Sequence, residues 1–400
     1  DDHSGQSITV ATTRPESMLG DTGVAVHPDD ARYIDFIGKN IKLPLTDRII
    51  PIVSDDSIEM EFGTGALKVT PAHDPVDFDI GERNNLQIIT VIGFDGNMSD
   101  AAGEYSGKDR FDCRQQIIND LTDLGILEKT ESLNHSVGHC QRCSSVVEPL
   151  ISLQWFLRVG NHNDPESIAG RAHTAVSNND ITIVPDRFSR VYLNWLENIR
   201  DWCISRQLWW GHRIPVWYCD TCTNPIASVD DISVCPSCGS RNIHQDNDVL
   251  DTWFSSGLWS HSTLGWPDNS QDLQRFYPGS VMETGYDILF FWVARMIMMG
   301  IENTGEIPFK TVFLHGLVRD ANGAKMSKTR GNTLDPLELI EKYGTDALRF
   351  ALTTGTAPGN DLRITDGKLE SARNFANKVW NASRYVMSNI DDEIDLSNWY

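Results

Sequence analysis

Short apolar runs separated by Gly, Asp and Pro fill the first 110 residues of the chain, a pattern typical of strands joined by tight turns. Five of these runs are predicted to be strands: residues 7–13, 23–28, 42–54, 65–73 and 86–96. A helix is predicted over residues 108–124, because Phe111, Ile117 and Leu121 recur at helical spacing and Gly125 follows them. The N-terminal part is therefore predicted to be a β-rich domain that carries a helix.

A second pattern begins near residue 152, where the chain becomes rich in aromatic residues. A strand-like run is followed by a helix-like run over residues 280–300, and another strand-like run covers 311–318. This alternation favours a parallel sheet flanked by helices, the doubly wound α/β arrangement. Further helices are predicted at 336–343 and 368–387, the second without a partner helix to pack against.

The length and charge of the chain limit the number of domains and the kind of binding site that can be expected. Four hundred residues exceed what one hydrophobic core usually serves, so two or three domains are expected. The balance of 34 Lys and Arg against 56 Asp and Glu gives a net charge of -22, the wrong sign for holding phosphates by bulk attraction. Any nucleic-acid site must therefore be a local basic patch. The most apolar stretch, 288–301, is interrupted by Arg295 and is shorter than the roughly 20 residues of a membrane-spanning helix, so no membrane span is expected.

The N-terminus carries neither a basic patch nor an apolar segment, so no secretory signal is expected. It also lacks an initiator Met, which suggests that the chain begins inside a longer protein. Six of the eight cysteines lie in three C-x-x-C pairs. Such pairs in a chain without a secretory signal favour zinc over disulfides, and so a reducing cytoplasm.

Two of these cysteine pairs predict a metal site. Cys219 and Cys222 form one pair, and after twelve residues Cys235 and Cys238 form the next. This spacing is typical of zinc knuckles that face each other across one tetrahedral ion. All four ligand positions are filled, so a structural Zn²⁺ is predicted rather than a catalytic one. Four reduced thiols without metal are the alternative.

The third pair, Cys140 and Cys143, has no obvious partner, because Cys113 is single and a four-cysteine site needs two more thiolates. His135 or His139 can complete a mixed site. Alternatively the partner pair lies upstream of residue 1, or this pair holds no metal.

A glycine-flanked loop at residues 323–332 reads GAKMSKTRGN. Lys325 and Lys328 lie three residues apart in this loop, so both can face a polyphosphate, and a flexible loop can close on ATP during reaction. The loop resembles the KMSKS loop of class I aminoacyl-tRNA synthetases, with Thr329 in place of the final Ser. The resemblance covers nearly the whole chain, since residues 11–28 and 63–78 resemble the editing domain of that family.

Within the family the chain most resembles the valine-specific branch, on segments 68–74 and 287–292. The resemblance implies ATP with Mg²⁺, valine and tRNA(Val) as substrates, and a cytoplasmic monomer. It implies that Lys325 and Lys328 are catalytic, and that ATP contacts the loop and the preceding strand at His315, Gly316, Lys325, Met326, Ser327 and Lys328. It places the valine pocket at Trp253, Ile288 and Trp292, with Asp287 as the partner of the substrate amine.

A pocket that accepts valine cannot strongly reject threonine, which has nearly the same shape, so a second, hydrolytic site is needed. The resemblance places this editing site at Thr12, Thr13, Arg14, Lys68, Thr70, Asp74 and Asp77. It implies that Asp74 holds the substrate ammonium, Asp77 its hydroxyl, and Lys68 or Arg14 the tRNA terminal phosphate or the developing oxyanion. A turn or N-cap role is the alternative for both aspartates, which lie in an Asp-Pro-x-Asp segment.

The predicted fold is an α/β multidomain arrangement: a β-rich editing domain, the second half of a Rossmann-like catalytic domain with a zinc-ribbon insert, and the start of an α-helical anticodon-binding bundle. The predicted segments are 1–150, editing domain ending in a zinc knuckle; 151–216, return into the catalytic core; 217–245, zinc ribbon; 246–335, second catalytic half; 336–366, connecting helices; and 367–400, start of the anticodon-binding bundle.

The His-x-Gly-His element of the family does not occur in this sequence, so the first half of the nucleotide-binding fold is expected upstream of residue 1. The chain alone is therefore not expected to activate valine. Two alternatives remain: an isoleucine-specific synthetase, against which the segment Lys68-Val69-Thr70 argues, and a non-catalytic RNA-binding module built on zinc ribbons.

Overall fold

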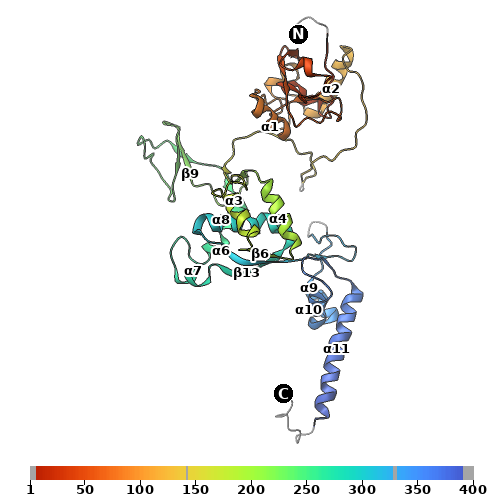
Figure 1. Cartoon of the computed structure of the whole chain (residues 1–400), viewed down its shortest axis with the longest axis vertical. Helices are drawn as coiled ribbons and strands as arrows, with labels where there is room; N and C mark the ends of the chain where they lie inside the picture. Colours follow the sequence, from red (N-terminus) through yellow and green to blue (C-terminus); the bar gives the residue numbers. More distant parts are fainter. Residues whose placement is uncertain (1–5, 141–142, 328–330, 391–400) are drawn as a thin grey trace. The chain divides into compact units, whose positions relative to one another are not determined.

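The computed structural model describes residues 6–140, 143–327 and 331–390. The chain divides into two compact units, unit 1 up to Leu153 and unit 2 from Gln154 onward (Figure 1). The boundary predicted from the sequence lies three residues earlier.

Unit 1 is built on a four-stranded sheet with the order β2-β3-β1-β4. The central strand β1 runs parallel to β3 and antiparallel to β4, and β2 runs antiparallel to β3. The segments of unit 1 are η1 Pro15–Gly20, β1 Gly23–Val26, η2 Ile34–Phe36, β2 Asn40–Lys42, β3 Ile49–Ser54, β4 Ala66–Val69, α1 Pro75–Asn84, η3 Asp100–Tyr105 and α2 Arg110–Asp123. Val26 of β1 and Ile117 of α2 are fully buried in a shared core.

Three predicted strand regions of unit 1 and its predicted helix are present, and two predicted strands are wrong. The region 42–54 contributes the end of β2 and all of β3, with a turn between them. Helix α2 begins where Asp109 accepts a hydrogen bond from the Phe111 amide, at 2.8 Å. Residues 7–13 and 86–96 form no strand. In the second case the amides of Val91 and Ile92 donate to Nε2 of the buried His73, at 2.9 and 3.3 Å, instead of to a neighbouring strand.

Unit 2 contains the predicted parallel sheet, with the order β13-β14-β6. The segments of unit 2 that precede β13 are β5 Phe156–Leu157, α3 Ile168–Ser177, β6 Thr182–Val184, α4 Arg187–Glu197, β7 Trp202–Cys203, β8 Ser205–Arg206, β9 Val216–Cys219, β10 Pro225–Ala227, β11 Ile243–Gln245, β12 Val249–Leu250, α5 Thr252–Gly257, α6 Trp259–Ser262 and α7 Gln271–Phe276. The later segments are β13 Gly279–Gly285, η4 Tyr286–Ile288, the π-helix η5 Leu289–Val293, α8 Ala294–Thr304, β14 Phe309–His315, β15 Val318–Arg319, α9 Pro336–Tyr343, α10 Thr345–Thr353, β16 Leu362–Arg363 and α11 Asp366–Ser388.

The core of the parallel sheet explains the apolar run near residue 290. Met296, Ile297 and Met298 of α8 are fully buried against Val312 and Leu314 of β14. Helix α8 is therefore apolar because it lies inside a protein core. Among the described helices, none combines the length and apolar character that a membrane crossing needs.

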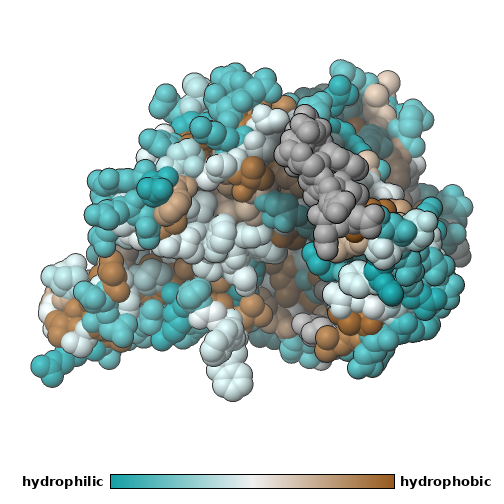
Figure 2. Space-filling view, turned by 90° about the horizontal axis from the view of Figure 1, so that it is seen from below, coloured by the Kyte–Doolittle hydropathy of each residue, from teal (hydrophilic) through white to brown (hydrophobic). Residues whose placement is uncertain are grey.

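Two smaller modules complete unit 2. Strands β10, β9 and β11 form an antiparallel ribbon that carries the cysteine pairs of residues 219–238. Helices α9, α10 and α11 share a separate small core that includes Tyr343, Ala347 and Leu369. Helix α11 covers the predicted segment 368–387, and its assignment to an anticodon-binding bundle stays a prediction. On the face shown in Figure 2, hydrophobic side chains lie scattered among hydrophilic ones.

The buried His73 makes a pH dependence of unit 1 predictable. Burial lowers its pKa to about 4 from 6.5, so an unfolded chain takes up a proton at pH 5 that the folded chain does not. The contribution of the neutral His73 to the free energy of unfolding is fully present above pH 6.5. It decreases as the pH drops toward 4, and at pH 5 about 2 kcal/mol of it has been lost. We expect His73→Gln to lose this component, so that its unfolding midpoint changes less between pH 7 and pH 5 than that of the wild-type chain.

The matched control is His135→Gln, which changes an exposed histidine of the same unit. It should retain the full wild-type change in a thermal unfolding experiment. An equal pH response in the His73 and His135 variants would contradict the assignment.

Candidate functional site: the buried charge cluster and the loop edge

Three of the predicted editing residues meet in a buried cluster at the end of β4. Lys68 lies in β4 and Thr70 directly follows it, two residues on, so both side chains share one face of the strand. The Lys68 ammonium donates to Asp21 Oδ1 at 3.2 Å, and the Thr70 hydroxyl donates to the same oxygen at 2.5 Å. The Thr70 amide donates to Asp77 Oδ2 at 2.8 Å. The cluster therefore joins β4 to the first turn of α1.

The two predicted aspartates have different surroundings. Asp74 is half-buried and caps α1, accepting hydrogen bonds from the amides of Val76 and Asp77 at 2.8 and 3.2 Å. This capping is the alternative role considered from the sequence, and among the described residues it uses only the Oδ1 oxygen of Asp74. Asp77 is buried, and burial raises its pKa to about 6 although the Thr70 amide opposes this. Asp77 therefore changes charge close to neutral pH.

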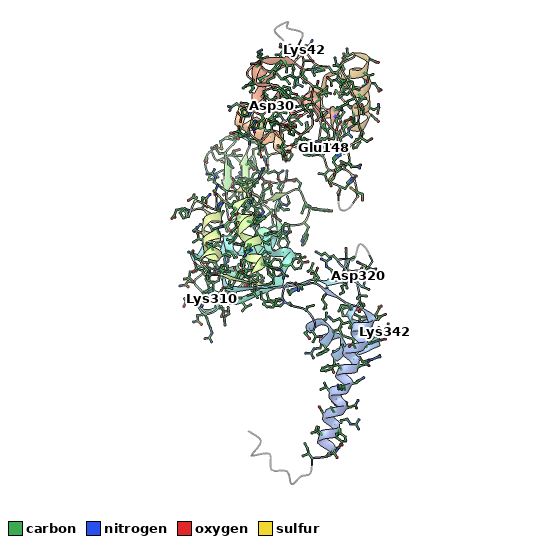
Figure 3. The ribbon with its side chains drawn as sticks, turned by 45° about the vertical axis from the view of Figure 1, so that its right-hand side comes forward. Asp30, Lys42, Glu148, Lys310, Asp320 and Lys342 are labelled. Carbon is green, nitrogen blue, oxygen red and sulfur yellow. The ribbon has the colours of Figure 1, made fainter. Side chains whose placement is uncertain are left out.

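Arg14 is fixed by contacts that reach across unit 1. Its guanidinium forms an ion pair with Glu148, labelled in Figure 3, and donates to the His73 carbonyl oxygen at 2.8 Å. Thr12 accepts a hydrogen bond from the Arg14 amide at 3.0 Å, and Thr12 and Thr13 are exposed. The predicted editing residues thus divide into exposed groups and a buried group behind them.

Most of the predicted ATP and valine residues lie at or near the carboxyl edge of the parallel sheet. His315 ends β14 and contacts Glu283 of β13 at 3.3 Å, and Asp287 follows the end of β13. Gly316 has no room for a side chain, since an added Cβ would lie 1.8 Å from the Asn360 carbonyl oxygen. Ligands of open α/β sheets bind outside this edge.

The described part of the predicted phosphate loop is held to this edge by an ion pair. The Lys325 ammonium lies 2.9 Å from Asp287 Oδ2. At the end of the loop, Asn332 accepts a hydrogen bond from the Ser327 amide and donates one to Asp320, labelled in Figure 3, each at 2.9 Å. Met326 is half-buried. Lys328 lies outside the described residues.

The predicted valine-pocket aromatics lie on adjoining elements. Trp253 on α5 stacks on Phe291 with ring centroids 5.7 Å apart. Trp292 on η5 donates its indole N–H to the Ser256 carbonyl oxygen at 3.0 Å, so η5 is fastened to α5. Ile288 is the half-buried last residue of η4.

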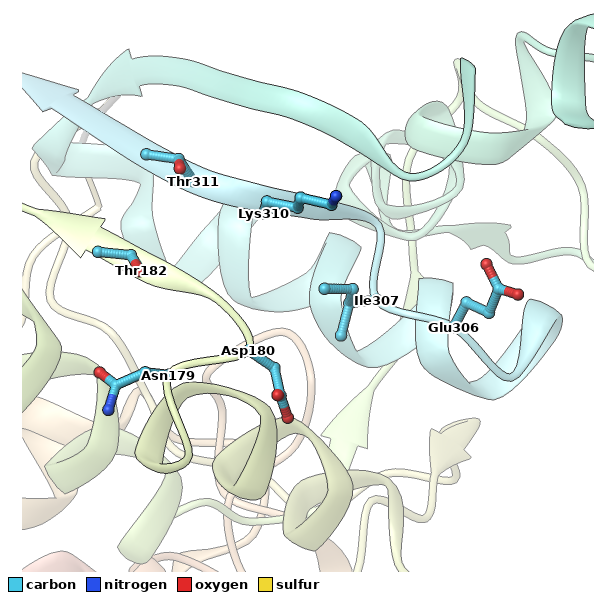
Figure 4. A pocket seen from close by; sticks show the side chains of 7 residues that line it. All are labelled: Asn179, Asp180, Thr182, Glu306, Ile307, Lys310 and Thr311. Carbon is cyan, nitrogen blue, oxygen red and sulfur yellow. The ribbon is translucent and has the colours of Figure 1, made fainter. Parts of the chain in front are cut away.

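An open hollow of about 580 Å³ lies at the opposite edge of the sheet, where β6 and β14 begin (Figure 4). Asp180, Thr182 and Lys310 are among its lining residues. Because ligands of such sheets bind at the carboxyl ends of the strands, this hollow is not the candidate active site.

The four cysteines of the ribbon converge as their spacing predicts. Their sulfur atoms all lie within 4.8 Å of one another, and the Cys219–Cys238 and Cys222–Cys235 sulfur pairs are each 3.6 Å apart. Zinc–sulfur bonds of about 2.3 Å in a tetrahedron require sulfur separations of about 3.8 Å, so the four thiols fit a zinc ion. The amide of Cys222 is the main cause that lowers the pKa of Cys219 to about 6, which favours a thiolate ligand.

The other pair is different. In the part of the chain that the structure describes, Cys140 and Cys143 are not joined by a third metal-ligating side chain. His139 instead donates to the Ser144 carbonyl oxygen at 2.8 Å. A hydrogen bond with Ser145 lowers the pKa of Cys143 to about 7. A mixed site with His135 or His139 therefore has no support in this arrangement.

Comparison with known proteins identifies the family. A family model described as tRNA synthetases class I (I, L, M and V) matches residues 76–365, more than half of the chain. The chain belongs to the class I tRNA synthetases. A second model, described as the editing domain of leucyl-tRNA synthetase, matches residues 32–119 of unit 1.

Several relatives that resemble this chain over almost its whole length are named valine--tRNA ligase. The valine--tRNA ligase of Dehalococcoides mccartyi (strain 195) is 60% identical over 97% of this chain and 43% of its own length. Those of Carboxydothermus hydrogenoformans and Clostridium perfringens are each 56% identical over 98% of this chain and 44% of their own length. The chain therefore spans less than half the length of these relatives. A solved methionyl-tRNA synthetase of Mycobacterium tuberculosis, in complex with methionyl-adenylate, covers 64% of this chain and 44% of its own at 22% identity and a TM-score of 0.45.

Two residues that contact the predicted editing residues were missed in the sequence analysis, Asp21 and Glu148. Asp21 follows a glycine in an apolar segment, and an acidic residue among buried neighbours is a usable signal. Glu148 contacts Arg14 across 134 residues of chain, and no local pattern marks it.

The cysteine cluster of the ribbon predicts a metal stoichiometry. We expect about one zinc ion for these four thiols, and we expect Cys222→Ser to lose it, because three thiolates and a hydroxyl bind zinc much more weakly. Metal content is measured by inductively coupled plasma mass spectrometry after gel filtration. Cys203→Ser, which changes a thiol outside the cluster, should leave the content unchanged. Equal zinc in the Cys222 variant and the wild-type chain would contradict the site.

Proposed function

We propose that the protein is a valine--tRNA ligase that activates valine with ATP, transfers it to tRNA(Val), and hydrolyses threonyl-tRNA(Val). The observation that carries this proposal is 52–60% identity to valine--tRNA ligases over 97–98% of the chain. These relatives favour valine over isoleucine. The editing-domain match and the polar cluster in unit 1 favour an enzyme over a zinc-ribbon binding module.

In the activation step the valine carboxylate attacks the α-phosphate of ATP, and pyrophosphate leaves with growing negative charge. Lys325 and Lys328 are proposed to stabilise this charge, which is largest in the transition state. Since Lys325 is paired with Asp287 in this structure, it must exchange that partner for the polyphosphate. Mg²⁺, bound with ATP, would neutralise further phosphate charge. Trp253, Ile288 and Trp292 are proposed to shape the valine pocket.

In the editing step water attacks the ester carbonyl of threonyl-tRNA. Thr12 and Thr13 are exposed and Arg14 and Asp74 are partly exposed, and these four residues are proposed to contact the aminoacyl end. Asp74 is proposed to hold the substrate ammonium. Lys68 and Thr70 lie behind them in the buried cluster, so Lys68 is proposed to act as a fixed positive charge near the oxyanion.

Further parts of the proposal concern the whole protein. We propose tRNA(Val) as its nucleic-acid partner, a monomeric state, and a cytoplasmic location, in keeping with cysteines that are all free. The ribbon is proposed to hold a structural Zn²⁺. Cys140 and Cys143 are proposed to pair with thiolates upstream of residue 1, and α11 to open an anticodon-binding bundle.

Deacylation by this chain tests the proposed editing function. We expect threonyl-tRNA(Val) to be hydrolysed about 100-fold faster than valyl-tRNA(Val), because hydrolysis must supply the discrimination that the valine pocket lacks. Loss of the radiolabelled amino acid from each tRNA is followed over time. Equal hydrolysis of both substrates, or of neither, would refute valyl-type editing by this chain.

Asp74→Asn separates the two roles of Asp74. Asparagine caps a helix as well as aspartate does, whereas Asp74→Ala costs about 1 kcal/mol of stability. We therefore expect the Asn variant to keep the wild-type unfolding midpoint and to lose about 10- to 100-fold in kcat/KM for threonyl-tRNA, as expected for a lost charged hydrogen bond. An Asn variant with the wild-type rate would show that Asp74 serves only as a cap.

A further inference from the structure

Asp21 is a buried carboxylate next to the predicted editing residues, and it is not among them. It lies between η1 and β1, and its side chain is 2% exposed. The neighbouring Thr22 amide donates to the Val69 carbonyl oxygen at 2.9 Å, which fixes this segment beside β4. The position of Asp21 relative to Lys68 and Thr70 is therefore set by the backbone.

One carboxylate oxygen of Asp21, Oδ1, accepts hydrogen bonds from both the Lys68 ammonium and the Thr70 hydroxyl. Lys68 also contacts Thr70 directly. Because the hydroxyl proton of Thr70 is directed to Asp21, the hydroxyl oxygen is left to act as an acceptor. Asp21 thus determines the direction of both polar groups.

Burying the charged Asp21 carboxylate without a partner would cost free energy. Burial raises the pKa of Asp21, and the Lys68 charge is the largest influence that opposes the rise. The other titratable groups that face the cluster are Arg48, Asp77 and the neutral His73, and the Arg48 guanidinium is itself bonded to the Leu19 carbonyl oxygen. A buried ion pair contributes little net stability compared with apolar side chains of similar volume. Stability alone therefore gives no reason for a charged pair at this place.

We propose that Asp21 is a positioning residue of the editing reaction, which holds the buried Lys68 ammonium in an ion pair and fixes the Thr70 hydroxyl beside it. The inference rests on the proposed editing function of unit 1. Without the Asp21 carboxylate, the buried Lys68 ammonium loses its ion-pair partner, and the Thr70 hydroxyl loses the oxygen to which it donates. Asp21 itself does not contact the substrate; it acts through Lys68 and Thr70.

A double-mutant cycle tests this role. Single-turnover hydrolysis of threonyl-tRNA(Val) is measured from pH 6 to pH 9 for the wild-type chain, Asp21→Asn, Lys68→Met and the double variant. We expect Asp21→Asn to lower the rate about 10- to 100-fold at neutral pH. We also expect a changed pH profile, because the Asp21 charge is one of the causes that raise the pKa of Asp77. Because Asp21 acts partly through Lys68, the double variant should lose less rate than the two single losses multiplied together.

Asp55→Asn is the matched control. Asp55 is another buried carboxylate of unit 1, and its ion-pair partner is Arg83. Its loss should affect unfolding and leave the hydrolysis rate and its pH profile unchanged. A merely structural role for Asp21 would make its variant behave like this control.

The unfolding midpoints of the same four proteins give a readout without tRNA. Each single variant leaves one buried charge unpaired, whereas the double variant leaves none. The unfolding midpoint of the double variant should therefore fall by less than the sum of the two single decreases. Additive losses in rate, or a wild-type rate and pH profile in Asp21→Asn, would overturn the inference while the editing function stands. If the wild-type chain does not hydrolyse threonyl-tRNA, the editing function and this role fall together, and the unfolding cycle still reports the ion pair.

Discussion

Unit 1 depends on the requirement that a buried charge must have a partner. Glu16 is fully buried, and Arg114 holds it with two hydrogen bonds of 2.7 and 2.6 Å from 98 residues further along the chain. Asp21 and Lys68 form a second such pair across 47 residues. Each pair is costly unless both partners arrive, so the fold that brings them together also assembles the site. The polar cluster therefore forms only when the distant segments of unit 1 pack together.

Unit 2 places its candidate residues by a different device. A parallel sheet delivers the ends of its strands to one edge, and His315 and Asp287 reach that edge from β14 and from the turn after β13. The backbone around residue 360 lies so close to Gly316 that only glycine fits. The Lys325–Asp287 ion pair then brings a loop to the same edge, although both partners are partly exposed and the pair contributes little to stability. Its importance is positional, since it connects the phosphate loop to the proposed pocket.

How far the sequence predicts this structure depends on the range of the interactions. The ribbon cysteines follow from spacing alone, because the ligands of a zinc knuckle are neighbours in sequence. Helix α2 follows from its spacing and its cap. The predicted strand at 86–96 fails because the ring of His73, which is distant in sequence, takes the hydrogen bonds of its amides. Asp21 and Glu148 belong to the site through contacts that join distant segments, and the other candidate residues were reached through family resemblance, since neither periodicity nor composition marks them.

The division of the proposed editing site into exposed and buried groups has a chemical logic. Groups that bind the aminoacyl end must reach solvent, and Thr12, Thr13 and Asp74 do. A positive charge that stabilises an oxyanion acts more strongly where water is excluded, and Lys68 is 6% exposed. A buried charge is costly unless a carboxylate accompanies it, and Asp21 forms that ion pair with Lys68. An acidic residue within the proposed site is therefore compatible with catalysis on a negatively charged tRNA end, because it is paired with the cation that is proposed to stabilise the oxyanion.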